Sequence, residues 1–123
     1  MTARGALRRI PRQRAAELYG GWWALRAVWR VRRALRERPL AQVNVAGPAR
    51  RPREAGRGVE RVLRLLDPSC LERSLVLQRW LATQGHRRAV VIGVRGRAAG
   101  FGAHAWLDGE AAPGFEELTR LGP

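Results

Sequence analysis

Two side chains in this sequence have the residue types that nucleophilic catalysis needs. Cys70 is the only cysteine of the chain, and His104 lies further along, in the segment 102–106. In thiol hydrolases and acyltransferases the nucleophile is the thiolate, and a nearby base must generate it. A thiol on a helix and an imidazole on a later strand would supply both groups, provided that the fold brings them together.

Cys70 stands at the predicted start of a helix. Ser69 is a favourable N-cap residue, and Glu72 completes a capping box. The first turn of a helix offers unpaired backbone N–H groups and the positive end of the helix dipole, and both favour a thiolate. The same N–H groups suit the oxyanion that forms during acyl transfer. The alternative is a buried structural cysteine, because a free cysteine packs like a small hydrophobic residue.

Hydrophobic periodicity predicts three helices in the first two thirds of the chain. A basic lead-in over residues 1–12 precedes a helix over 13–38. Residues 39–58 are rich in proline and glycine, which is typical of a linker or surface loop. A second helix is expected over about 59–66, and the third runs from Cys70 to a stop at a glycine.

The first predicted helix has apolar residues at the spacing of one helical face. We expect this face to consist of Leu18, Trp22, Leu25, Val28 and Trp29. Its tryptophans, at positions 22, 23 and 29, are a candidate docking surface for a partner protein. Packing against the body of the same domain is the alternative.

The last third of the chain has the pattern of extended structure. The β-branched run 89–94 predicts a buried strand, and 101–107 predicts a second strand. An Asp-Gly pair at 108–109 is a strong hairpin signal, so a short third strand is expected over about 110–112. The tail, 115–121, is predicted to form a turn or a short helix.

The composition fits a single chain of 123 residues with enough apolar material, 46%, for a core. Its net charge is +14, all the basic residues are arginines, and they are spread along the chain. Such a charge attracts nucleic acid, anionic lipid or acidic peptides, and compositional bias is the alternative explanation. A lone cysteine forms no intramolecular disulfide, so we expect a reducing, cytoplasmic location. We expect neither a signal peptide nor a membrane span.

The residues around the thiol and the imidazole form a longer pattern. It consists of Cys70-Leu-Glu-Arg-Ser-Leu-Val-Leu, Gly85, Ile-Gly-Val-Arg at 92–95 and Ala-His-Ala-Trp at 103–106. This combination resembles the transglutaminase-like leader peptidases of lasso peptide biosynthesis over about residues 58–121. The basic N-terminal helix is also similar to that of the family.

The resemblance implies an α+β fold of transglutaminase/papain-like type. A helix bearing Cys70 would pack on a small antiparallel β-sheet bearing His104, with an N-terminal helix added. The chain would divide into a basic N-terminal helix and linker, 1–57, and a transglutaminase-like cysteine peptidase domain, 58–123. Cys70 then matches the nucleophile, and His104 the general base that later protonates the leaving amine. No cofactor or metal is implied, since one cysteine and two histidines without a cluster do not make a zinc site.

The acidic residue that orients the histidine in this family has no clear equivalent here. If the hairpin turn has two residues, the family's acid falls near Gly114, which has no side chain. Asp108 shares a strand face with His104, but four strand residues span about 13 Å. Glu116, or its neighbour Glu117, would have to fold back. We rank Glu116 before Asp108, and a backbone carbonyl is a further alternative.

The resemblance also implies partners. The substrate is a ribosomally made precursor peptide, whose leader is removed so that a separate ATP-using lasso cyclase can close the ring. The chain resembles the protease half of a split pair, so a separate leader-recognition protein is expected. Two other functions remain open: a non-enzymatic, arginine-rich nucleic-acid-binding protein, and a transglutaminase-like acyltransferase that passes the acyl group to an amine. We favour the peptidase, without nucleic acid as a partner, because base-reading motifs and stacked aromatic patches are missing.

Overall fold

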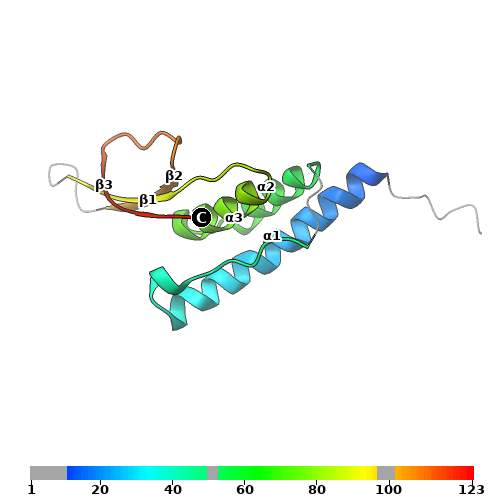
Figure 1. Cartoon of the computed structure of the whole chain (residues 1–123), viewed down its shortest axis with the longest axis horizontal. Coiled ribbons are helices and arrows are strands. Elements are labelled where there is room, and N and C mark those ends of the chain that lie inside the picture. The colour runs from blue at the N-terminus through cyan, green and yellow to red at the C-terminus, as the bar shows by residue number, and fades with distance from the viewer. Residues whose placement is uncertain (1–10, 50–52, 97–101) are drawn as a thin grey trace, which may run out of the picture.

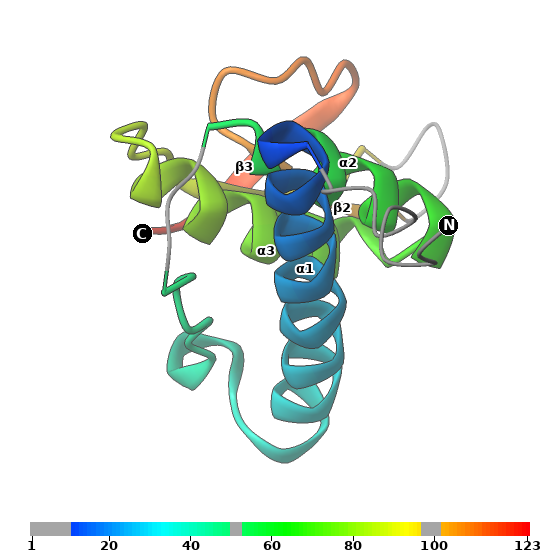
Figure 2. The ribbon, with the colours of Figure 1, turned by 90° about the vertical axis from the view of Figure 1, so that its right-hand side faces the viewer.

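The helix that begins at Cys70 lies between the N-terminal helix and a small antiparallel sheet (Figures 1 and 2). The computed structural model describes residues 11–49, 53–96 and 102–123, and most of the expected basic lead-in lies outside these ranges. The helices are α1 (Arg12–Glu37), the short 3-10 helix η2 (Leu40–Gln42), α2 (Ala55–Leu66) and α3 (Cys70–Thr83). The predicted α+β class is confirmed, with helices and sheet in separate parts of the chain.

The sheet has its first strand in the middle. Its strands are β1 (Val90–Arg95), β2 (Ala103–Leu107) and β3 (Phe115–Leu121), in the order β2-β1-β3. The pairing is antiparallel on both sides, and Gly93 is opposite His104 on one side and Glu117 on the other. The predicted strands over 89–94 and 101–107 are therefore confirmed where the structure describes them.

The prediction for the end of the chain was wrong. Residues 110–112 do not form a strand, and the tail 115–121 is a strand that pairs with β1 instead of a turn or helix. The reason lies at the outer edge of β2, where the Glu110 carboxylate accepts the Leu107 N–H at 2.9 Å. This contact occupies the edge that a returning strand would need, so the chain continues to the free edge of β1.

The apolar face of α1 also differs from the predicted one. Leu18, Trp22 and Trp29 are exposed, whereas the buried stripe is made largely of small residues. It consists of Gly20, Gly21, Trp23, Ala24, Ala27, Val28 and Val31. The cause is the approach of α2, whose backbone comes so close to α1 that only small side chains fit between the two helices.

Glycines create this close contact. A Cβ at Gly20 would lie 2.1 Å from the carbonyl oxygen of Ala55, and one at Gly58 would lie 1.8 Å from that of Glu17. Glycine weakens an isolated helix, but here it lets two backbones touch. The contact also explains why α2 begins at Ala55, earlier than the predicted start at 59.

A single hydrophobic cluster joins the helices to the sheet. The indoles of Trp23 and Trp80 lie 5.6 Å apart, centroid to centroid, and Val28 of α1 is as fully buried as Val76 of α3. Residues on both sides of position 57 thus contribute to one core. The division into two parts at that position stays a prediction.

Gly85 ends α3 as predicted. Its φ is +87°, and the N–H groups of Gly85 and His86 donate to the carbonyls of Ala82 and Leu81, at 3.2 and 2.9 Å. This is the Schellman arrangement, which favours glycine at the left-handed position. Among the described residues, no helix is both long and apolar enough to cross a bilayer.

We expect Gly58→Ala to lower the free energy of unfolding by about 2 kcal/mol or more, because the added methyl group forces the backbones of α1 and α2 apart. Gly56→Ala is the matched control on the same helix, since its Cβ would meet Trp80 at an ordinary 3.4 Å. Urea denaturation of both variants measures the difference. Equal stability of the two would contradict the role assigned to the glycine contact.

Candidate active site

The start of α3 is held by the predicted capping box. The Ser69 hydroxyl accepts the Glu72 N–H at 3.2 Å, and the Glu72 carboxylate accepts the Ser69 N–H at 2.9 Å. Ser69 has the extended backbone of an N-cap residue, with φ −60° and ψ 159°. Cys70 is therefore the first residue of the helix, next to N–H groups that have no partner within the helix.

The same Glu72 carboxylate binds α1. Its second oxygen accepts a hydrogen bond from Arg32 at 2.8 Å, and the Glu72 side chain is largely buried. Burial would raise the pKa of Glu72, but the N–H of Ser69 and the Arg32 guanidinium together hold it below its ordinary value of 4.5. The carboxylate is thus an ion at neutral pH and joins α1 to the start of α3.

The thiol of Cys70 lies against the outer edge of β2. Its Sγ accepts the Ala105 N–H at 3.4 Å, and the residue is half-buried. On the other side of the strand, the Gly102 carbonyl accepts the Arg95 N–H, and the Asp108 N–H donates to the Ala89 carbonyl. The backbone groups of the even-numbered residues of β2 therefore point to β1, and those of the odd-numbered residues point to the open edge. The Ala105 N–H therefore points to the open edge, where it meets the sulfur.

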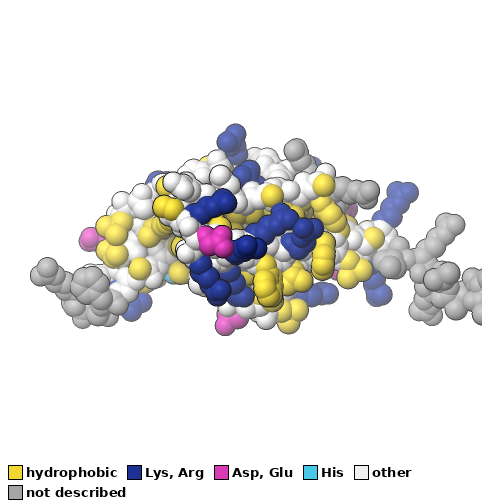
Figure 3. Space-filling view, turned by 90° about the horizontal axis from the view of Figure 1, so that it is seen from below, with side chains coloured by type: hydrophobic (Ala, Val, Ile, Leu, Met, Phe, Trp, Pro, Cys, Tyr) yellow, Lys and Arg dark blue, Asp and Glu magenta, His cyan; other side chains and the backbone are white. Residues whose placement is uncertain are grey.

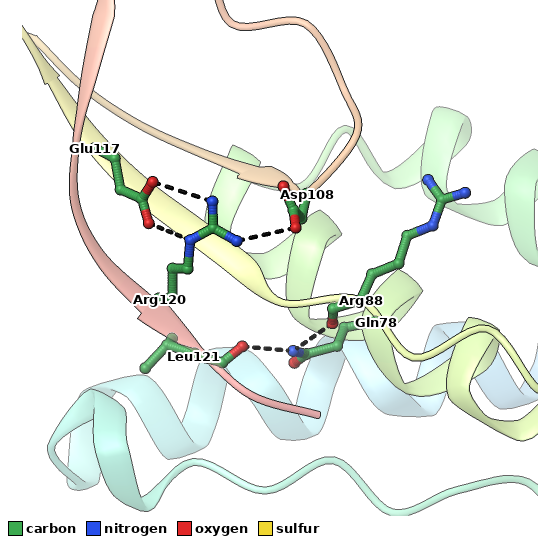
Figure 4. Close-up of polar contacts among 6 residues, drawn as sticks. All are labelled: Gln78, Arg88, Asp108, Glu117, Arg120 and Leu121. Carbon is green, nitrogen blue, oxygen red and sulfur yellow. Dashed lines mark hydrogen bonds and ion pairs between the residues drawn. The ribbon is translucent and has the colours of Figure 1, made fainter.

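Two further polar residues fix α3 to the sheet. Ser74, one turn after Cys70, is fully buried and donates from its hydroxyl to the Ala105 carbonyl at 3.4 Å. Gln78, another turn on, donates from Nε2 to the carbonyls of Arg88 at 3.0 Å and Leu121 at 2.8 Å (Figure 4). Sequence reasoning missed Ser74. The sequence pattern that could have indicated it is the four-residue spacing of Cys70, Ser74 and Gln78, which places them on one face of the helix.

The imidazole of His104 lies on the other face of the sheet. Its ring centroid is 5.1 Å from that of Phe115 and 5.8 Å from that of Trp106. The indole of Trp106 passes over Gly93, where a Cβ would come within 2.5 Å of the ring. An aromatic cluster thus holds the imidazole away from the core, and glycine makes room for it.

The structure brings Cys70 to the main chain beside His104 without joining the two side chains. Within the described residues the thiol and the imidazole form no hydrogen bond in this conformation. However, the sulfur bonds to the N–H of the next residue, and peptide geometry then places Sγ within about 6 Å of the His104 Cα. The two groups are neighbours around the strand edge.

The two candidate carboxylates have different surroundings. Asp108 binds Arg120 at 2.9 Å, and Arg120 also binds Glu117, so these neighbours raise the pKa of the guanidinium (Figure 4). Glu116 is exposed, and among the described residues it forms no ion pair. Neither Asp108 nor Glu116 contacts His104. Glu117 lies on the same face of the sheet as His104, because both residues pair with Gly93 of the central strand β1.

The chain belongs to the transglutaminase-like superfamily. The profile of that superfamily matches residues 6–121, which includes α1 as well as the Cys70 helix and the sheet. No curated protein and no solved structure matches the chain. Over the ranges 11–49, 53–96 and 102–123, no three His, Cys, Asp or Glu side chains are grouped as metal ligands.

We expect Glu72→Gln to lower the free energy of unfolding at neutral pH by about 1 kcal/mol or more, since it weakens the cap and the Arg32 pair together. Because the folded pKa of Glu72 is lowered, this stabilisation is present above pH 4.5 and is lost as the pH falls through the folded value. Denaturation of both proteins across this range measures the difference, which should shrink in acid. Glu60→Gln, at an exposed position of α2, is the control, and a pH-independent difference would contradict the assignment.

Proposed function

We propose that the chain is a cysteine peptidase that cleaves the leader peptide from a lasso peptide precursor through a thioester acyl-enzyme. The observation that carries the proposal is the position of Cys70: a half-buried thiol at a capped helix start, against the main chain beside His104. Membership of the transglutaminase-like superfamily supports thiol chemistry. The choice of substrate rests on the resemblance of the motifs around Cys70 and His104 to the leader peptidases.

In the proposed reaction the His104 imidazole accepts the thiol proton, and Sγ attacks the scissile carbonyl carbon. The oxyanion that forms faces the free N–H groups of the first turn of α3. Collapse breaks the C–N bond, and His104 gives its proton to the leaving amine. Water then attacks the thioester with His104 as base, which releases the new carboxylate and restores the thiol.

This reaction requires His104 to leave the aromatic cluster. The sulfur lies within about 6 Å of the His104 Cα, so a change of rotamer brings an imidazole nitrogen towards it around the edge of β2. We propose that substrate binding along this edge accompanies the change of rotamer.

The partners of the proposed reaction follow from the resemblance. We propose that a separate leader-recognition protein presents the precursor and that a lasso cyclase takes the cleaved core peptide, in the cytoplasm. A transglutaminase-like acyltransferase would use the same thioester and pass the acyl group to an amine in place of water. Product analysis distinguishes the two, because hydrolysis leaves a free carboxylate and transfer leaves an amide.

We expect Cys70→Ala to abolish leader cleavage and His104→Ala to reduce it by about 10³-fold or more, because nucleophile and base act as a unit. Precursor cleavage, followed by mass spectrometry in the presence of the leader-recognition protein, measures both. His86→Ala is the matched control, since His86 is the other histidine and is exposed at the end of α3. Cleavage by the Cys70→Ala variant at the normal rate would refute the proposal.

We further expect Glu116→Gln to slow cleavage more than Asp108→Asn does. Asp108 is already engaged by Arg120, whereas the Glu116 carboxylate is not held in an ion pair among the described residues. Because it alternates with Glu117, Glu116 lies on the α3 face of the sheet, towards which the imidazole turns in the proposed reaction. The pH profile of kcat/KM for both variants is the measurement, because loss of an orienting carboxylate changes the histidine limb of the profile. A larger effect of Asp108→Asn would reverse the assignment.

A further inference from the structure

The outer face of α1 carries large apolar side chains that the fold leaves uncovered. Trp22 and Trp29 are 59% and 68% exposed, although tryptophan side chains are highly buried on average. Arg26 and Arg30 lie on the same face, at helical spacing from Trp22. We call these four residues the Trp–Arg face. Figure 3, seen from the α1 side, shows hydrophobic and arginine side chains interspersed across this surface.

The Trp–Arg face is hollowed. A cavity of about 260 Å³ lies between α1 and the segment 46–49, and Trp22, Arg26 and Arg30 line it. Its far wall is held in place because Trp23 donates from Nε1 to the Ala46 carbonyl at 3.1 Å. Arg30 also lines a larger neighbouring hollow of about 710 Å³ together with Trp29. The two hollows therefore adjoin at one arginine.

The charges of this face are not neutralised from within. Among the described residues neither Arg26 nor Arg30 forms an ion pair, whereas Arg32 and Arg33 of the same helix are paired with Glu72 and Glu37. Carboxylates or other anions of an occupant would therefore find two guanidiniums that no acidic side chain of the described residues already binds. The walls contributed by Ala27, Ala46 and Ala49 suit an aliphatic or aromatic side chain in the hollow.

We propose that the Trp–Arg face docks an acidic amphipathic segment of another protein, with its carboxylates on Arg26 and Arg30 and an apolar side chain in the hollow between α1 and residues 46–49. A second copy of this chain is a poor occupant, because a net charge of +14 opposes self-association at an arginine-rich face. The sheet lies on the side of α3 away from α1 (Figure 1), and the Cys70 thiol contacts its strand β2, so an occupied Trp–Arg face leaves the thiol accessible. The inference therefore does not depend on the reaction proposed for Cys70.

The test uses the full chain and a fluorescent synthetic peptide in which leucine and glutamate repeat at helical spacing. We expect saturable binding by fluorescence anisotropy that weakens with added salt. The double variant Arg26→Glu, Arg30→Glu should bind about tenfold or more weakly. Trp22→Ala should also weaken binding while it keeps the charge, which separates the apolar contribution from the ionic one.

The matched control is Arg61→Glu with Arg64→Glu, which makes the same change of net charge on exposed positions of α2. Selective loss in the α1 double variant supports the proposal, and equal loss in both doubles overturns it in favour of a non-specific charge effect. Tighter binding of a single-stranded oligonucleotide, lost with the same α1 arginines, overturns it in favour of nucleic acid. Dimerisation of the free chain that the α1 double variant abolishes would assign the face to a second copy. Far-UV circular dichroism confirms that each variant is folded.

Discussion

The carboxylate of Glu72 ties together the parts of the molecule that position the thiol. One oxygen closes the cap that begins α3 at Cys70, and the other binds Arg32 on α1. A helix start is otherwise prone to fraying, since its first N–H groups lack partners. Here the Glu72 carboxylate is bound both by the Ser69 N–H and by Arg32, and these contacts fix the position of Cys70, the residue after the N-cap. A nucleophile benefits from such fixation, because small displacements of a reacting group are costly to the rate.

From this fixed start, α3 controls where the sheet lies. Ser74 and Gln78 follow Cys70 at one-turn intervals and bond to the main chain of β2, of the segment entering β1 and of the end of β3. Each contact joins a side chain of α3 to a particular backbone carbonyl. It therefore fixes which residue of the strand lies beside α3, and not only that the strand lies near the helix. The thiol is thus set beside Ala105 by the same row of contacts that orders the sheet.

What could be predicted depends on how local the cause is. The capping box, the glycine stop and the first two strands follow from neighbouring residues, and all were predicted from the sequence. The buried face of α1 was not, because it is selected by the glycine contact between two helices distant in sequence. Strand β3 was missed for a similar reason: Glu110 closes the edge of β2, and this follows from a contact that no local pattern reveals. Local propensity yields to tertiary context in both cases.

The positions of the two candidate catalytic groups have a common structural origin. The sequence suggested that sulfur and imidazole meet across a seam between helix and sheet, but alternation along β2 sends His104 to the face opposite α3. Ala105, the next residue, faces the helix, and its N–H points to the edge where the sulfur lies. Because β2 is an edge strand, no further strand separates its two faces at the outer edge. In a central strand a neighbouring strand would lie between them. In the proposed reaction the imidazole therefore approaches the thiol by rotation of the His104 side chain around this edge. The neighbours of His104 at 102, 103 and 105 are glycine or alanine, so none of these three positions places a large side chain beside this edge.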